Sequence, residues 1–177
     1  MKKHNGMRPQ DVVILLKIAT MEGQKWLGKD LSSALFISPS EVSESINRSI
    51  YAGLLDEGKQ KLMRQSLLEF LEHGLKFVYP QMPGAIVRGM PTAHSAPPLN
   101  SLIQSSEIFV WPDALGESRG QAIEPLHRGV VKAARQDSYL YELLALTDTL
   151  RFGRAREQNI AMQELTNRLK HPREKKN

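Results

Sequence analysis

The residues best suited to metal chemistry are five histidines, because the chain has no cysteine. Glu124 and His127 could share one face of a helix, but two ligands do not complete a metal site. The absence of cysteine excludes thiolate ligands, iron–sulfur clusters and a cysteine nucleophile. We therefore expect no metal and no cofactor. The histidines are His4, His73, His94, His127 and His171.

Catalytic patterns are equally incomplete. Ser95 directly follows His94, which is the wrong geometry for a nucleophile and its base. Gly116 and Gly120 have the spacing of a phosphate-binding loop, but no Lys-Ser/Thr pair follows them. The sequence predicts no catalytic residues, and we expect a protein that is not an enzyme.

A helix-turn-helix is the clearest functional pattern. Residues 28–36 have the composition of a short helix, and Ile37-Ser38 forms a tight turn before a third helix over 39–52. Ser38-Pro39-Ser40-Glu41 predicts its start, with a serine cap, proline at the first helical position and glutamate three residues after the cap. Val42, Ile46 and Ile50 define its buried face, and Gly53 ends it.

In a helix-turn-helix, the second helix of the motif enters the major groove of DNA. With Ile46 at the centre of the buried face, positions 44 and 48 point outward. Arg48 could donate two hydrogen bonds to guanine, and Asn47 could pair with adenine. Ser40 and the helix N-terminus could hold a phosphate. The predicted DNA-contacting residues of this segment are Ser38, Ser40, Glu44, Asn47, Arg48 and Tyr51.

Charge is the weak point of this prediction. Glu41 and Glu44 lie on or beside the outward face, which has Arg48 as its only cation. Phosphate contacts must then come from neighbouring cations, which are Lys25, Lys29, Lys59, Lys61 and Arg64. The net charge is +5, and residues 151–177 carry 8 basic and 3 acidic side chains. A basic tail suits nucleic acid or an acidic protein partner, although a solvated helix end is an equally good interpretation.

The N-terminal third resembles the winged-helix domain of MarR-type transcriptional regulators. The residues that carry the resemblance are Leu31, Leu35, Ile37-Ser38, Val42-Ser43, Ile46 and Tyr51-Ala52-Gly53-Leu54-Leu55. It implies DNA reading by the third helix and minor-groove contact by a basic β-hairpin wing. The sequence after Leu55 departs from this pattern, since it shows no clear hairpin and leads into a helix. A wing could instead form from 75–79 paired with residues near 86–88.

The second half resembles poorly characterised bacterial winged-helix proteins, a group associated with nucleotidyltransferase-like genes in toxin–antitoxin pairs. The similar stretches are Arg88-Gly89-Met90-Pro91-Thr92-Ala93, Ala96-Pro97-Pro98-Leu99, Arg119-Gly120-Gln121-Ala122-Ile123-Glu124-Pro125-Leu126 and Gly153-Arg154-Ala155-Arg156-Glu157. The implied alternative is a winged helix used as a docking domain for a protein partner.

Apolar periodicity predicts the remaining elements and a mainly α-helical α+β fold. The expected helices are 9–22, 64–73, 126–136, 138–151 and 154–170, the expected strands are 75–79 and 108–111, and 116–124 is expected to be a loop. We expect three parts: a winged-helix DNA-binding domain over 7–80, a connecting loop region with short strands over 81–124, and a C-terminal helical segment over 125–171. Residues 138–151 are apolar on most faces, which favours a core helix or a dimer interface.

Together these features predict a transcriptional regulator that binds double-stranded DNA as a dimer. The alternative is a protein-interaction module. No apolar run reaches the roughly 18 residues of a membrane span, and the polar start of the chain lacks the pattern of a signal peptide. We therefore expect a cytoplasmic protein with no membrane contact.

Overall fold

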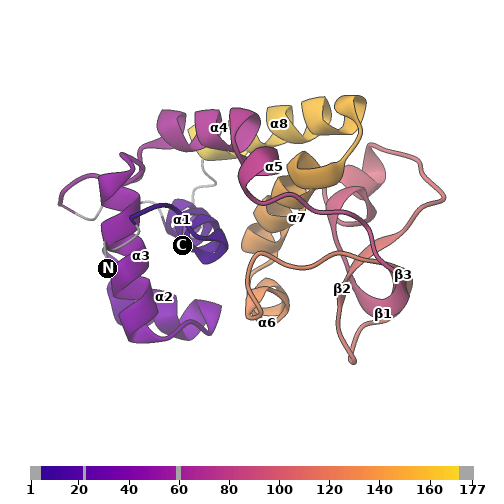
Figure 1. Cartoon of the computed structure of the whole chain (residues 1–177), viewed down its shortest axis with the longest axis horizontal. Coiled ribbons are helices and arrows are strands. Elements are labelled where there is room, and N and C mark those ends of the chain that lie inside the picture. Colours follow the sequence, from indigo (N-terminus) through magenta and orange to yellow (C-terminus); the bar gives the residue numbers. More distant parts are fainter. Residues whose placement is uncertain (1–4, 22, 59–60, 172–177) are drawn as a thin grey trace.

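The computed structural model describes residues 5–21, 23–58 and 61–171, and it confirms the α+β class with a mainly helical chain. Three helices form one end of the molecule, and three short strands form the other (Figure 1). The helices are α1 (Pro9–Thr20), α2 (Gly28–Leu35), α3 (Pro39–Tyr51), α4 (Arg64–His73), α5 (Leu75–Val78), α6 (Val130–Gln136), α7 (Ser138–Phe152) and α8 (Ala155–Lys170), with 3₁₀ turns at Ala93–Ser95 and Leu99–Ser101. The strands are β1 (Ile86–Pro91), β2 (Phe109–Pro112) and β3 (Ser118–Ala122).

The predicted turn between α2 and α3 is present. α2 ends because Phe36 adopts a left-handed conformation, with φ at 57°. Ile37 is buried, and the Ser38 hydroxyl then accepts the Glu41 N–H at 3.3 Å, which caps α3. α1 packs against both α2 and α3, so the three helices form one compact group.

A short hairpin follows α3, contrary to the prediction of no hairpin after Leu55. Leu55 pairs with Leu62 in an antiparallel bridge. The Asp56 N–H donates to the Lys61 carbonyl, and the Met63 N–H donates to the Leu54 carbonyl, both at 3.0 Å. Residues 59 and 60 between these arms lie outside the described residues. Leu54 and Leu55 are adjacent and both buried, so the sequence lacks the alternation that signals a strand.

The predicted strand over 75–79 is wrong, because Leu75–Val78 is a turn of helix, α5. Gly74 keeps right-handed helical angles and does not stop the chain, so α5 continues directly from α4. The helical turn buries Leu75 and leaves Phe77 exposed, whereas an alternating strand would place both on one face. The proposed wing from 75–79 and 86–88 is therefore also wrong.

The strands instead form a small closed sheet. β1 is antiparallel to both β2 and β3, and β2 and β3 are parallel to each other. The closure is tight: a Cβ on Gly120 would lie 2.4 Å from the Ile108 carbonyl oxygen. β3 lies inside the stretch predicted to be a loop. Its sequence, Ser-Arg-Gly-Gln-Ala, lacks the β-branched and aromatic residues that signal a strand.

α7 runs through the centre of the molecule (Figure 1). It contacts α1 on one side, α5, α6 and α8 on others, and the 3₁₀ turn after β1. Its residues from Leu143 to Arg151 are all buried. α7 is therefore the core helix and not the dimer surface that its sequence also allowed, because its apolar faces are already covered within the chain.

Candidate nucleic-acid interface

The exposed side of α3 is a stripe of four polar side chains, which we name the α3 stripe: Ser40, Ser43, Asn47 and Tyr51. Their spacing of three to four residues places them on one side of the helix. Tyr51 is 75% exposed, and Asn47 is also exposed. The stripe can offer amide and hydroxyl groups to a partner, but it carries no charge.

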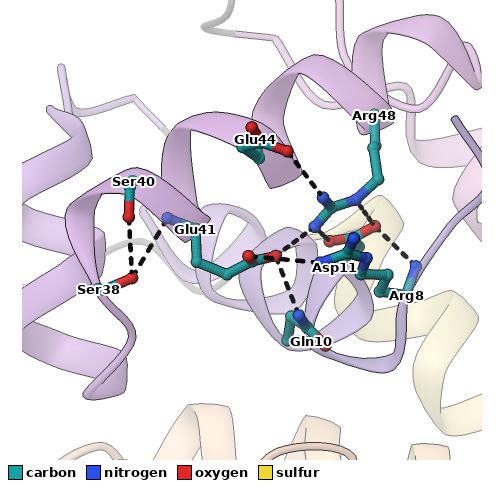
Figure 2. A network of polar contacts seen from close by, with 8 residues as sticks. All are labelled: Arg8, Gln10, Asp11, Ser38, Ser40, Glu41, Glu44 and Arg48. Atoms are coloured by element: carbon teal, nitrogen blue, oxygen red, sulfur yellow. Dashed lines mark hydrogen bonds and ion pairs between the residues drawn. The ribbon is translucent and has the colours of Figure 1, made fainter. Parts of the chain in front are cut away.

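The prediction that Arg48 points outward is wrong. The residue is 6% exposed, and its guanidinium faces α1 (Figure 2). Nε donates to one oxygen of Asp11 at 2.8 Å, and Nη2 donates to the other at 2.7 Å. Asp11 is fully buried, and the hydrogen bonds between the two groups raise the pKa of Arg48. Arg48 therefore fastens α3 to α1 and has no reach toward a base.

Two glutamates complete this network. Glu41 accepts from Arg48 Nη2 at 2.6 Å and from Gln10 Nε2 at 3.0 Å. Burial alone would raise the pKa of Glu41, but the hydrogen bonds from Arg48 and Gln10 outweigh it and lower this pKa. Glu44 lies 3.8 Å from Arg48 Nη1. Arg48 thus faces three carboxylates, Asp11, Glu41 and Glu44, and Arg8 lies 3.5 Å from Glu41 as a second cation. The cluster therefore keeps a net negative charge, which opposes the approach of phosphates.

The start of α3 holds the two predicted serines. Ser38 and Ser40 are exposed, and their hydroxyl oxygens lie 3.3 Å apart. Ser38 is occupied by the cap on α3, so Ser40 is the hydroxyl that remains for a ligand. Ser40 lies at the N-terminus of α3, and its contact with a phosphate stays a prediction.

The flanking cations differ in their exposure to solvent. Lys25, Lys29 and Lys61 are exposed, and Lys59 lies outside the described residues. Arg64 is half-buried and donates to the Leu169 carbonyl at 2.6 Å, so it links α4 to the end of α8. This bond gives Arg64 a structural role at the surface of the fold.

Sequence reasoning missed Ser43 and Phe36. Ser43 lies four residues before Asn47, on the same side of the helix. Helical spacing would therefore have predicted its place in the α3 stripe if Arg48 had been assigned to the buried side. Phe36 is 41% exposed at the turn, and the Lys132 ammonium lies 5.6 Å from its ring centroid. A left-handed phenylalanine gives no sequence signal, because this conformation is typical of glycine or asparagine.

A second buried polar network lies between α7 and the sheet, around Asp148 of α7. One of its oxygens accepts from Thr92 at 2.7 Å and from Trp111 Nε1 at 2.6 Å, and the other accepts from Arg151 at 2.9 Å. Arg151 also donates to the Tyr79 and Glu124 carbonyls. Burial raises the pKa of Asp148 against these interactions, which favour its charged form. Every group is satisfied internally, as in a structural network.

Within the described ranges, no three His, Asp or Glu side chains gather as metal ligands would. No described helix has the length and apolarity of a membrane span. Comparison with known proteins gives no match to a protein family, to a curated protein or to a solved structure.

Proposed function

We propose that the chain is a DNA-binding transcriptional regulator that presents the α3 stripe to the major groove of double-stranded DNA. In this proposal α1, α2, α3 and the short 54–63 hairpin act as a winged helix with a reduced wing. The observation that carries it is the position of α3: it follows α2 after a three-residue turn, and its outer side is polar and exposed. The regulator acts in the cytoplasm.

Base reading falls to Asn47 in this proposal, because Arg48 is held by Asp11. The Asn47 amide can pair with the N6/N7 edge of adenine. Ser40 and the exposed Lys29 and Lys61 supply the nearest phosphate contacts. Since a single helix-turn-helix covers few base pairs, the regulator binds as a homodimer on paired half-sites.

The test is fluorescence anisotropy of the purified chain with the duplex upstream of its own gene, beside a scrambled duplex, at about 150 mM salt. Binding to the native duplex at least about a thousandfold tighter supports the proposal. Weak and equal binding to both duplexes would mean that the exposed lysines bind phosphates without reading sequence. Analytical ultracentrifugation of the complex reports whether two chains occupy one duplex.

The absence of an exposed cation on α3 favours one second candidate, a protein-interaction module. A neutral polar stripe with glutamates at its edge fits a protein partner, for example a nucleotidyltransferase-like enzyme encoded nearby, better than it fits phosphates. Co-expression of the neighbouring gene product separates the two candidates. A stoichiometric complex that Asn47→Ala or Tyr51→Ala disrupts would support docking through α3, and a chain that purifies alone and reads DNA would exclude it.

A further inference from the structure

A second exposed segment lies where the chain passes from α5, near the middle of the molecule, to β1 at the end away from α3 (Figure 1). Four large apolar side chains are exposed within ten residues: Phe77 at 74%, Val78 at 52%, Met82 at 84% and Ile86 at 65%. Scattered exposed apolar residues are ordinary, and this segment stands out because four of them fall within ten residues of the chain. We name these four residues the apolar strip.

The backbone beneath the apolar strip is fixed at several points. Arg151 of α7 donates to the Tyr79 carbonyl at 3.0 Å. The Gly84 N–H donates to the Ala122 carbonyl, and the Ala122 N–H donates to the Ala85 carbonyl, both at 2.9 Å. The exposed side chains therefore stand on an ordered backbone, which lowers the entropy cost of binding a partner.

Two arginines extend this surface along the sheet. Arg88 of β1 is directly opposite Arg119 of β3, and Ile86 is opposite Gln121. Side chains of a strand point alternately to its two faces, so Ile86 and Arg88, two residues apart, share one face. Like charges directly opposite each other destabilise a sheet. Among the described residues, Arg88 Nη1 donates to the Gly116 carbonyl at 3.4 Å, and neither arginine is ion-paired with a carboxylate. An anion from outside can therefore neutralise these two like charges.

The charge of the surface decides between occupants. Residues 74–91 contain Lys76 and Arg88 and no Asp or Glu. On the β3 side, exposed Glu117 stands two residues before Arg119, so the surface keeps a net positive charge. A second copy of the chain would bring the same cationic surface against itself. The sequences at 1–4 and 172–177 each have a net positive charge and do not complement it either. Nucleic acid would satisfy the arginines but would leave four apolar side chains without apolar contacts.

We propose that the apolar strip, together with Arg88 and Arg119, is a docking surface for an acidic peptide segment of another protein. Apolar side chains of that segment cover Met82 and Ile86. Its carboxylates pair with the two guanidiniums, each of which can bind a carboxylate in bidentate geometry. This surface shares no residue with the α3 stripe, so in this proposal the chain carries two separate binding surfaces.

Selection of peptides from a displayed random library by the full-length chain tests the surface without knowledge of the partner. The baits are the parent chain, the double variant Met82→Gln/Ile86→Thr and the control Leu115→Gln, which alters an equally exposed apolar residue in the β2–β3 connection. The parent and the control should enrich the same acidic peptides with apolar anchors. Circular dichroism and thermal melting establish that each variant is folded.

The best peptide is then synthesised for fluorescence polarisation. Met82→Gln/Ile86→Thr should weaken its binding at least about tenfold, as loss of central anchors does. Arg88→Gln/Arg119→Gln should weaken it and flatten its salt dependence. Asn47→Ala should leave peptide binding unchanged, so a failure of the DNA-binding proposal would not affect this result.

Several results overturn the proposal: no enriched peptide, enriched peptides that are neutral or basic, or equal binding by the parent and Met82→Gln/Ile86→Thr. Sedimentation equilibrium and DNA-binding measurements on the same variant test whether a second copy of the chain or nucleic acid occupies the surface instead. A dimer that this variant dissociates would assign the surface to a second copy of the chain, and loss of duplex binding would assign it to nucleic acid.

Discussion

Arg48 of α3 and Asp11 of α1 form a buried, two-pronged ion pair, with donor–acceptor distances of 2.8 and 2.7 Å. The Arg8 N–H donates to the same Asp11 carboxylate at 2.8 Å, so one buried group holds the start of α1 and the middle of α3 together. The orientation of the α3 stripe therefore depends on a residue pair that is itself hidden from any partner.

Arg48→Ala should lower the free energy of unfolding by about 3–5 kcal/mol, because it leaves the Asp11 carboxylate buried without its main partner. Urea denaturation followed by circular dichroism measures the change. Arg156→Ala is the matched control, since this arginine is exposed on α8, and it should be neutral. A stable Arg48→Ala variant with weakened DNA binding would instead return Arg48 to the interface.

Asn47→Ala should leave stability unchanged and weaken binding to the specific duplex by about 1–3 kcal/mol, as expected for the loss of one base contact. Lys29→Ala should weaken the native and the scrambled duplex alike and reduce the salt dependence, because a phosphate contact carries no sequence information. Anisotropy titrations at several salt concentrations separate these effects. Equal losses on both duplexes for Asn47→Ala would remove it from base reading.

Asp148→Asn should destabilise the chain by about 3–5 kcal/mol, although the side chain keeps its size. The amide offers one oxygen where the carboxylate serves Trp111, Thr92 and Arg151, so at least one buried donor loses its acceptor. Glu117→Gln is the control, because it makes the same chemical change at an exposed site. Denaturant titration of both variants tests this, and equal stability would mean that Asp148 is not a structural centre.

His127 predicts a pH dependence of stability. Burial, followed by the charge of Arg128, lowers the pKa of His127 below its ordinary value of 6.5, and its Nδ1 accepts the Gly129 N–H at 3.0 Å. The unfolded chain therefore takes up the proton first as the pH falls. The stability that His127 contributes is complete above about pH 6.5 and is lost as the pH falls toward the lower folded pKa.

Comparison of the parent with His127→Asn isolates this contribution, because asparagine can still accept the Gly129 N–H but does not titrate. Thermal melting between pH 5 and 8 should show a smaller acid loss for the variant. Identical pH profiles would mean that another group causes the acid loss.

Local signals in the sequence were sufficient to predict α2, α3 and the turn between them. The Ser38 cap, the proline at the first position of α3 and the leucines of α2 are interactions between near neighbours, and the structure has α2 and α3 where they were predicted. The error at Leu75–Val78 arose because a short apolar run fits a strand or a helical turn equally well, and contact with α7 decides between them.

The site was harder to predict than the fold. Position 48 lies away from the face of α3 that is centred on Ile46, and for this reason it was predicted to be exposed. In the structure it faces α1. The sequence does not show which side of α3 the start of α1 covers. Asp11 beside an apolar run from Val12 to Leu16 was the available hint, since a buried carboxylate requires a partner. The strand predicted over 108–111 corresponds to β2. β1 and β3 were harder to recognise because both contain glycine where the closed sheet brings backbones together.

The central position of α7 has a consequence for proteolysis. The connection at 80–85, between α5 and β1, is mostly exposed and is therefore accessible to a protease. α7 holds the segment before that point through α1 and through the Arg151 bond to Tyr79, and it holds the segment after it through Asp148. If a protease cut the chain there, the two fragments would remain associated and would separate only on denaturation.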